Sequence, residues 1–509
     1  MNKEILINVG AGEIRIAVVV DGRLQELFLE RTIGLDDDSP RRRTLHRGGR
    51  SLIGSVILGR VQRVLPGMQA AFVDIGLDRA GFLGAREARC LAGLPVFDDE
   101  RQPRIGDCVR EGEEIVVQVV KDPIGEKGAR LSANVTVPGR LLVLVPNQTG
   151  VAVSRRIEDE TERARLTMLC EELLGESNAA LAPGGGYIVR SAAIGARLGE
   201  LRDDAERLAE AWRPVAAKRA GLVAPAMLYH DLDPIERTMR DEVDILTSRV
   251  VIDERQAFVT ALDYCRRAMP DAEGRIKLFE GPGVLFEMYD VEDEIERLLS
   301  ERVPLPSGGW ITIEGTEALT AIDVNSGSYA NGTGLEETSL DVNLEAAEEI
   351  GRQLRLRGIG GLIVVDFIHL GQPANIERVL DCLARSLERD RTTTQISPMS
   401  EFGLVEITRK RVRDPLFKLV TEGCRACRCR GRVRTRESVA MDVLRRIERE
   451  AATSPGRPIL VRAAPEIVRW LEEHETELRP ALERKSASRV RFEERAEFAR
   501  EGFDVAIQS

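Results

Sequence analysis

Two short apolar segments that each end in an aspartate constrain the fold of this 509-residue chain more than any other feature. The first ends at Asp323, within LTAIDVNSG (319–327), and the second is GLIVVD, which ends at Asp366. A helical pattern at 336–357 lies between them. A crossover of that length generally joins parallel strands, so both aspartates are expected at the same edge of one sheet. Carboxylates placed there suit a divalent metal ion that also contacts a substrate phosphate.

The length and composition indicate several domains. A chain of 509 residues with 43% hydrophobic content exceeds the roughly 250–300 residues that one core usually organises. No segment approaches the roughly 20 apolar residues of a membrane helix. Glu4 and Asn8 interrupt the apolar N-terminal stretch, which therefore does not look like a signal peptide. We expect a soluble, cytoplasmic protein that has no association with a membrane.

The charge of the chain is unevenly distributed. A net charge of −11 argues weakly against a nucleic-acid ligand, but a total hides local clusters. Each basic cluster alone is more often a solvated surface. Together with a carboxylate pair, they favour a polyanionic ligand. The clusters lie at 40–50, 154–156, 408–413 and 425–436.

Hydrophobic periodicity gives a coarse outline of the elements. Residues 3–31 alternate like a hairpin, and 52–137 contain the short, turn-separated strands of a small barrel. The later segments are a strand at 141–145, helices at 161–174 and 200–222, a mostly helical region at 235–302 with a strand near 256–262, a strand–helix–strand series at 310–420, and an α+β tail from about 432.

The same aspartate segments carry a resemblance to a known family. TEALTAIDVNSG (316–327), NLEAA (343–347), RQLRLR (352–357) and GGLIVVDFI (360–368) closely resemble the ribonuclease E/G family of bacterial endoribonucleases. The resemblance covers essentially the whole chain, and the length is similar to the compact, ribonuclease G type. It implies a multidomain α+β and α/β fold in which an S1 (OB-fold) barrel is inserted into a ribonuclease H-like subdomain.

The resemblance also implies domain boundaries. The expected divisions are a first ribonuclease H-like segment (1–49), an S1 RNA-binding domain (50–137), a 5′-sensor domain (138–234), a second ribonuclease H-like segment (235–302), a DNase I-like catalytic domain (303–420), a zinc-link (421–431) and a small C-terminal α+β domain (432–509).

At the catalytic site, the resemblance makes Asp323 and Asp366 ligands of a catalytic Mg²⁺, which Mn²⁺ could replace. Asn325 would hold the attacking water or the scissile phosphate, and hydrolysis would leave a 5′-phosphate and a 3′-hydroxyl. His369 stands where the family usually has aspartate. Histidine is a poor magnesium ligand, so the metal preference is expected to differ.

Three residues of the barrel match the RNA-binding residues of the family. Phe72 and Phe82 match its base-stacking aromatics, and Lys127 matches the lysine beside them. Stacking on aromatic rings tolerates any base sequence, which suits a single-strand binder. Without the resemblance, two core phenylalanines would be the simpler interpretation.

Arg190 and Ser191 match the arginine–threonine pair that receives a substrate 5′-monophosphate in the family, with serine retaining the hydroxyl. An arginine fork with a hydroxyl is a suitable phosphate cradle. Glu401 stands where the family commonly has a basic residue. An acid beside a phosphate is unfavourable, so 5′ sensing is expected to be weakened.

Cys424 and Cys427, in CRAC, match the position of the family's CPxC zinc link. A structural zinc ion takes four ligands, and in the family the other two come from a second subunit. The motif therefore implies a zinc-clipped homodimer, from which tetramers can be built. Cys429 is an extra thiol that could compete for the ion, and a lone CxxC also occurs in redox pairs.

The sequence thus predicts a magnesium-dependent endoribonuclease that cuts single-stranded RNA in rRNA and tRNA maturation and in mRNA decay. The basic run at 408–413 would contact RNA phosphates, or else be a solvated surface. The alternative from another class is a non-catalytic S1-type RNA-binding or ribosome-associated protein. Intact Asp323, Asn325 and Asp366 favour the enzyme, since a pure binder needs none of them.

Overall fold

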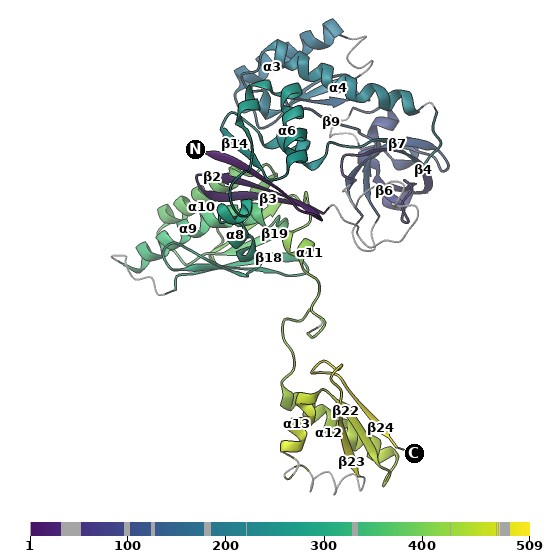
Figure 1. The fold of residues 1–509 in the computed structure, drawn as a ribbon, viewed down its shortest axis with the longest axis vertical. Coiled ribbons are helices and arrows are strands. Elements are labelled where there is room, and N and C mark those ends of the chain that lie inside the picture. Colours follow the sequence, from purple (N-terminus) through teal and green to yellow (C-terminus); the bar gives the residue numbers. More distant parts are fainter. Residues whose placement is uncertain are drawn as a thin grey trace. The chain divides into compact units, whose positions relative to one another are not determined.

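The computed structural model describes residues 2–31, 52–95, 102–123, 128–177, 185–219, 221–327, 334–427, 429–474, 476, 478 and 489–508. Contacts divide the chain into two compact units, Met1–Pro415 and Leu416–Ser509, which are described separately (Figure 1). Among the described helices, none has the length and apolar character needed to cross a bilayer.

The N-terminal strands share a sheet with strands from much later in the chain. β1 (Lys3–Val9), β2 (Glu13–Val20) and β3 (Arg23–Arg31) are consecutive and antiparallel. β1 also pairs in parallel with β14 (Thr247–Ile252), which continues to β15 (Ile276–Leu278). The order β15-β14-β1-β2-β3 therefore joins the expected hairpin to the region at 235–302 in one layer.

One expected strand in this region is wrong. Residues near 256–262 belong to α6 (Arg255–Ala268). Its first turn is capped by the carboxylate of Glu254, which accepts the amides of Gln256 and Ala257. Buried Ala257 and Ala261 lie four residues apart, as one face of a helix requires. Together with α5 (Pro234–Glu242), α6 supplies the core beneath β1 and β14.

Five short strands then close a small barrel, as the sequence predicted, and its topology fits an S1 or OB-like domain. β4 pairs with both β5 and β7, and β6 and β8 complete the circuit. The strands are β4 (Val56–Leu65), β5 (Ala70–Asp74), β6 (Gly81–Gly84), β7 (Glu114–Lys121) and β8 (Arg130–Ser132). The short helix α2 (Ile105–Cys108) packs against its core, and β13 (Ala226–Tyr229) adds to β4 from outside.

A four-stranded sheet of order β11-β12-β10-β9 follows the barrel. Its strands are β9 (Val137–Pro138), β10 (Leu142–Val145), β11 (Gly150–Val153) and β12 (Gly186–Val189). Two long helices, α3 (Glu160–Ser177) and α4 (Leu198–Arg219), share a buried apolar core with it. The expected strand at 141–145 and the two expected helices are confirmed.

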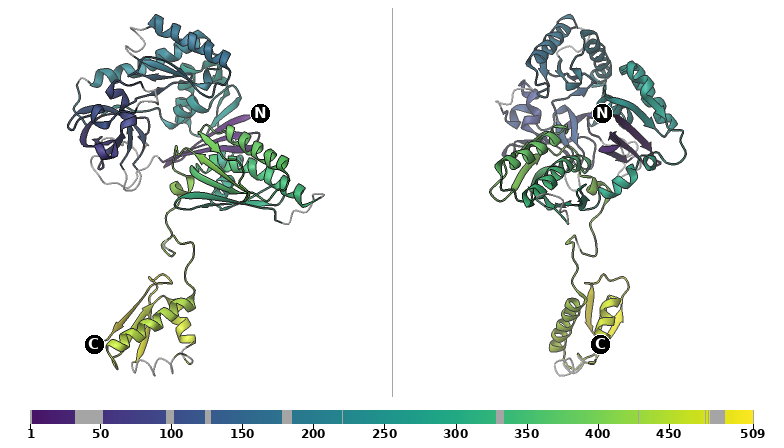
Figure 2. Two further views of the ribbon diagram at one scale, coloured as in Figure 1. Left: turned by 180° about the vertical axis from the view of Figure 1, so that it is seen from behind. Right: turned by 90° about the vertical axis from the view of Figure 1, so that its left-hand side faces the viewer.

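The largest apolar cluster of the first unit lies under a six-stranded sheet of order β16-β17-β18-β19-β21-β20. Helices α9 (Leu335–Leu356) and α10 (Pro373–Glu388) pack on one face of it (Figure 2). Short helices α7 (Leu285–Met288) and α8 (Val291–Arg297) precede this sheet in the chain. Its strands are β16 (Arg302–Pro304), β17 (Trp310–Gly315), β18 (Leu319–Asn325), β19 (Gly361–Asp366), β20 (Thr394–Ile396) and β21 (Leu404–Arg409).

The second unit is a small α+β domain, as expected. Its sheet has the order β23-β22-β24, formed by β22 (Ile459–Ala463), β23 (Val490–Glu494) and β24 (Phe503–Ile507). Helices α12 (Arg436–Thr453) and α13 (Pro465–Glu473) form its core with the sheet, and α11 (Leu416–Val420) begins the unit.

Candidate active site

The two aspartates lie side by side at one edge of the six-stranded sheet. β18 and β19 are parallel neighbours joined by α9, and their register pairs Asp323 directly with Asp366. Both residues are exposed, whereas Ile322 and Val365 beside them are buried in the core. Alternation along a strand therefore places the two carboxylates on the face opposite the helices. The expected shared edge is confirmed.

Asn325 lies on the same face, two residues after Asp323. Its side-chain Nδ2 donates a hydrogen bond to Oδ2 of Asp323 at 2.7 Å. This contact fixes the orientation of the carboxylate and leaves the amide oxygen of Asn325 available as an acceptor. The sequence-predicted trio of Asp323, Asn325 and Asp366 is thus brought together.

A buried asparagine on α9, which the sequence did not single out, positions the loop after Asp366. Asn343 has 0% exposure; its Nδ2 donates to the carbonyl oxygen of Ile368 at 2.7 Å, and its Oδ1 accepts the amide of Ile368 at 3.0 Å. Leu340 and Ala347 flank it on the apolar side of the helix. A polar residue within that apolar face was the available signal.

The loop that holds His369 is also tied to α9. His369 is exposed, and Glu336 at the start of α9 accepts the amides of Gly371 and Gln372 at 2.9 and 3.1 Å. These contacts hold the two residues that precede α10 against α9. The amide of Gly371, followed by the side chain of Asn375, lowers the pKa of Glu336, so this carboxylate stays ionised at neutral pH.

The donor set at the sheet edge fits a hard divalent cation. Mg²⁺ is usually held by one or two carboxylates and completes its shell with waters and substrate phosphate oxygens. Asp323 and Asp366 supply two such carboxylates in register and open to solvent. In the described portion of the chain, three or more His, Cys, Asp or Glu side chains never gather as a metal cage.

The barrel aromatics form one pair on its outer surface. Phe72 on β5 is the cross-strand partner of Phe82 on β6, and their rings meet edge to face with centroids 6.1 Å apart. Both phenylalanines are half-buried, whereas their neighbours on the same strands, Ala71, Val73 and Leu83, are buried in the barrel core. The pair is therefore outside the core and accessible to a base. Lys127 lies outside the described residues.

Arg190, the candidate phosphate ligand, already has an acidic partner. Its Nη2 donates to Asp241 at 2.8 Å, and its Nη1 donates to the carbonyl oxygen of Gly139. Ser191 beside it is exposed. Glu401 is also exposed, in the segment between β20 and β21. Both terminal nitrogens of the Arg190 guanidinium are thus already engaged within the protein.

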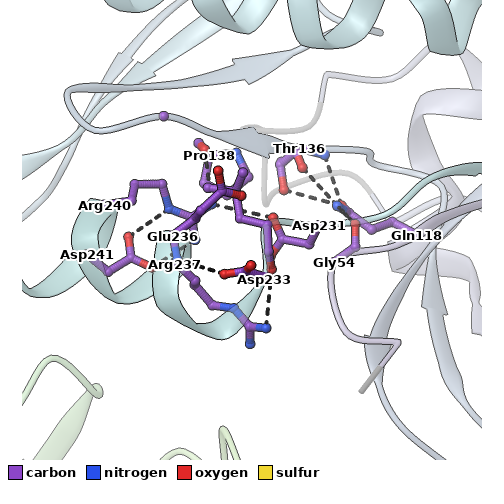
Figure 3. Close-up of polar contacts among 12 residues, drawn as sticks. Gly54, Gln118, Thr136, Pro138, Asp231, Asp233, Glu236, Arg237, Arg240 and Asp241 are labelled. Carbon is purple, nitrogen blue, oxygen red and sulfur yellow. Dashed lines mark hydrogen bonds and ion pairs between the residues drawn. The ribbon is translucent and has the colours of Figure 1, made fainter. Parts of the chain in front are cut away.

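Asp241 is held from its other side by Arg240, whose side chain is only 5% exposed (Figure 3). Arg240 donates to both carboxylate oxygens of Asp241, at 3.0 and 2.8 Å, and to the carbonyl oxygen of Pro138 at 3.2 Å. Burial alone would raise the pKa of Asp241, but the hydrogen bonds and charge of Arg240, with the charge of Arg190, lower it. Asp241 is therefore ionised at neutral pH and lies between two arginines.

The same junction holds the barrel against the strand that follows it. The side-chain amide of Gln118, on β7, donates to the carbonyl oxygens of Gly54 at 2.9 Å and Thr136 at 2.8 Å (Figure 3). The amide of Thr136 donates back to Gln118 at 3.0 Å. Because Gln118 is buried, these contacts fix the exit of the chain from the barrel.

The basic run at 408–413 is only partly available to a ligand. Arg409 is buried and forms an ion pair of 2.6 Å with buried Asp390. Arg413 is half-buried and donates to the carbonyl oxygens of Leu27 and Arg355 at 2.6 and 2.7 Å. These two arginines have structural roles, whereas Lys410 and Arg411 are exposed.

The cysteine cluster belongs to the second unit. Cys424 is exposed and Cys427 is buried, and the amide of Cys429 donates to the carbonyl oxygen of Cys424 at 3.3 Å. The backbone amide and then the thiol of Cys427 lower the pKa of Cys424. Two thiols supply half of a tetrahedral site.

Comparison with known proteins identifies the family of the chain. A model described as the ribonuclease E/G family matches residues 136–412, and a model described as the RNase E/G thioredoxin-like domain matches residues 423–508. The chain therefore belongs to the ribonuclease E/G family and is an endoribonuclease that acts in RNA processing.

Individual relatives indicate the type of enzyme within the family. Ribonuclease G of Escherichia coli K12 is 36% identical over 514 aligned residues, covering 100% of both chains. Ribonuclease G of Haemophilus influenzae is 38% identical, covering 99% of each. Ribonuclease E of Escherichia coli K12 is 36% identical over 88% of this chain but only 40% of its own length. The chain is thus a ribonuclease G-type member of the family, as the sequence motifs predicted.

Proposed function

We propose that this enzyme hydrolyses single-stranded RNA in a magnesium-dependent reaction that leaves 5′-phosphate and 3′-hydroxyl ends. The processes it serves are rRNA and tRNA maturation and mRNA decay. The observation that carries the proposal is the register pairing of two exposed carboxylates, Asp323 and Asp366, at the end of adjacent parallel strands. All eight cysteines are free thiols, as is usual in a reducing compartment, and we place the enzyme in the cytoplasm.

Each residue at the sheet edge has a distinct role in this proposal. Asp323 and Asp366 would hold Mg²⁺, or Mn²⁺ in its place, which would polarise the scissile phosphate and favour ionisation of water. Asn325 fixes Asp323 through its amide nitrogen and offers its amide oxygen to orient the attacking water. Asn343 keeps the loop after Asp366 in one conformation.

The barrel would bind the RNA strand away from the cleavage site. Phe72 and Phe82 offer half-buried rings on the barrel surface, where bases can stack without a sequence requirement. Lys127 would neutralise a phosphate beside them. We retain the domain boundaries expected from the resemblance, including the ribonuclease H-like, 5′-sensor and DNase I-like divisions. The separate sheets of the first unit support this division.

Arg190 and Ser191 would receive the substrate 5′-monophosphate. The ion pair with Asp241 orients the guanidinium of Arg190. A phosphate would bind those guanidinium N–H groups that do not donate to Asp241 or Gly139. Because Asp241 competes with a phosphate and Glu401 is an acid, we propose a weak preference for 5′-monophosphate ends over 5′-hydroxyl ends.

Cys424 and Cys427 would bind a structural Zn²⁺ together with the same pair from a second subunit. The enzyme would then be a homodimer, or a tetramer built from two such dimers. Zinc analysis of the purified enzyme should give about half an ion per chain. A Cys427→Ser variant should lose both the zinc and the dimer, whereas Cys429→Ser should keep both. A zinc-free active monomer would refute the link.

A cleavage assay on a fluorescent single-stranded oligonucleotide tests the central proposal. Asp323→Asn and Asp366→Asn should each abolish cleavage while RNA binding persists, and EDTA should do the same to the unmodified enzyme. Asp341→Asn, an exposed aspartate on α9, is the matched control and should cleave normally. End analysis of the products should find 5′-phosphates. Cleavage retained by either active-site variant would overturn the assignment.

A further inference from the structure

The exposed face of the catalytic sheet carries an arginine in the same row as the two aspartates. Arg302 on β16 pairs with Thr312 on β17, Thr312 pairs with Asp323, and Asp323 pairs with Asp366. The next row pairs Trp310 with Asn325. Neighbouring strands lie about 4.8 Å apart, so the backbone of Arg302 is about 10 Å from that of Asp323.

Arg302 and Trp310 form a cation–π pair on this face. The guanidinium carbon of Arg302 lies 3.6 Å from the centroid of a Trp310 ring. Arg302 is exposed and Trp310 is half-buried. Stacking leaves the edge N–H groups of a guanidinium free and holds the fork in one plane, which is the geometry that suits a phosphate.

The side chain of Arg302 has no acidic partner among the described residues, unlike buried arginines such as Arg240, Arg352 and Arg409. Arg352, for example, forms ion pairs with Glu349 and Glu294, both at 2.6 Å. Among the strand residues that face this side of the sheet in the described chain, Arg302 is the one cation. The acidic residues on the same side are Glu314, Asp323, Asp366 and Glu406. On the described strands, a polyanion that approaches this face therefore meets a single positive charge, that of Arg302.

The turn after Asn325 is shaped to admit the Trp310 ring. Gly327 has φ +61°, and a Cβ there would lie 3.1 Å from the ring of Trp310 and 2.8 Å from the carbonyl oxygen of Gly308. A side chain at position 327 would thus displace both. The glycine keeps the indole against the end of β18, beside Asn325.

We propose that Arg302 and Trp310 form a nucleotide-binding subsite beside the cleavage site. Arg302 binds a phosphate that flanks the scissile one, and the base of that nucleotide stacks on the Trp310 ring or on the guanidinium that covers it. This inference rests on the proposed function, since it takes the Asp323–Asp366 edge as the place of cleavage. The subsite adds a contact to the substrate within the catalytic sheet itself, separate from the barrel surface.

RNA binding in EDTA, where cleavage is silent, tests the phosphate contact. Arg302→Gln should weaken binding of a short single-stranded oligonucleotide about threefold to tenfold at low salt. It should also reduce the slope of log affinity against log salt by about 0.7, the value for one lost phosphate contact on a single strand. Arg302→Lys should keep most of that slope. Arg255→Gln, which removes an exposed arginine from α6, is the matched control and should change neither quantity.

The fluorescence of Trp310 tests the stacking contact directly. The chain contains three tryptophans, so a Trp212→Phe, Trp470→Phe variant reports on Trp310 alone. Saturating RNA should change its emission, and Trp310→Leu in the unmodified enzyme should weaken binding about fivefold or more. Unchanged emission, at RNA concentrations where a label on the RNA reports full binding, would overturn the stacking.

The kinetic outcome separates this inference from the proposed function. Under Mg²⁺, Arg302→Gln should raise KM and leave kcat close to that of the unmodified enzyme, because the contact is made before and during cleavage alike. If Asp323→Asn abolishes cleavage while Arg302→Gln leaves KM and the salt slope unchanged, the subsite is wrong and the function stands. If Asp323→Asn still cleaves, the function is wrong, whatever the binding result for Arg302.

Discussion

Asn343 satisfies both backbone groups of Ile368 with a single side-chain amide. One residue is on the crossover helix and the other is two positions after Asp366, so the helix and the sheet edge that carries Asp366 cannot shift independently. The amide is buried, which makes each of its hydrogen bonds costly to lose.

Asn343→Ala should therefore lower both stability and turnover. Loss of the amide leaves the N–H and C=O of Ile368 without partners, at a cost of about 1–3 kcal/mol for each buried group. We expect kcat to fall about tenfold or more because Asp366 loses its support, while KM for RNA changes little. Ile350→Val, a buried change in the same helix, should cost about 1 kcal/mol of stability without this loss of kcat. A kcat equal to that of the control would contradict the positioning role.

His369→Asp should lower the Mg²⁺ concentration that gives half-maximal cleavage. The exposed histidine follows Asp366 by three residues, and a carboxylate there adds an oxygen donor of the type that Mg²⁺ prefers. A shift of about threefold to tenfold is expected from one added carboxylate near the ion. His369→Asn removes the ring without adding charge and serves as the control. Equal Mg²⁺ titrations for the two variants would exclude His369 from the metal environment.

Phe72→Leu should weaken binding of single-stranded RNA about fivefold to a hundredfold, since stacking contributes about 1–3 kcal/mol per base. Leucine keeps the apolar contact with Phe82 but removes the π face. Fluorescence anisotropy with a labelled oligonucleotide measures the effect, and thermal unfolding checks that stability is kept. Affinity equal to that of the unmodified enzyme would return Phe72 to a purely structural role.

Arg190→Gln should equalise the cleavage of 5′-monophosphate and 5′-hydroxyl substrates. Single-turnover rates on the two substrates give the discrimination factor for each variant. Asp241→Asn should increase discrimination, because it removes the carboxylate that competes for the Arg190 fork. Identical rates on both substrates in the unmodified enzyme would remove the sensor role altogether.

Glu242 should make stability fall as the pH rises through neutrality. Burial raises the pKa of Glu242 from 4.5 to about 7. The charge of Arg391 opposes this increase and that of Glu26 adds to it, while Lys3 lowers the pKa and Asp241 raises it. Between these values the folded state keeps the proton that the unfolded state releases, so the contribution to stability is complete below about pH 4.5 and is lost as the pH rises through about 7.

Comparison with Glu242→Gln isolates that contribution. The free energy of unfolding of the variant, relative to the unmodified enzyme, should increase by about 2–3 kcal/mol between pH 5 and 8. Glu296→Gln, an exposed change on α8, should give a flat difference over the same range. A flat difference for Glu242→Gln would show that this carboxyl does not titrate in the window.

The features of the site that the sequence predicted depend on the local pattern of apolar and turn residues and on the general rules for how strands are connected. The crossover between the aspartate segments required parallel strands, and this placed Asp323 beside Asp366 without any further information. The barrel strands were recognisable because each is short, alternating and bounded by turn residues.

The features that the sequence did not predict depend on contacts distant along the chain. The pattern at 256–262 reads as a strand until the cap at Glu254 and the sheet of β1 and β14 select the helix. The partner of Arg190 lies 51 residues away, at Asp241. The burial of Arg409 and the partial burial of Arg413 likewise follow from tertiary packing, so the basic run at 408–413 has fewer exposed positive charges than its sequence suggests.

The open side of the catalytic sheet has a consequence for where a strand can be cut. Within the described residues, Asp323 and Asp366 are exposed to solvent and lie on an open face of the sheet. A chain laid across such a surface can enter from its middle, with both ends far away. If cleavage takes place at these two carboxylates, as proposed, the enzyme has no need to thread a terminus and can cut a long polymer wherever an unpaired stretch reaches them.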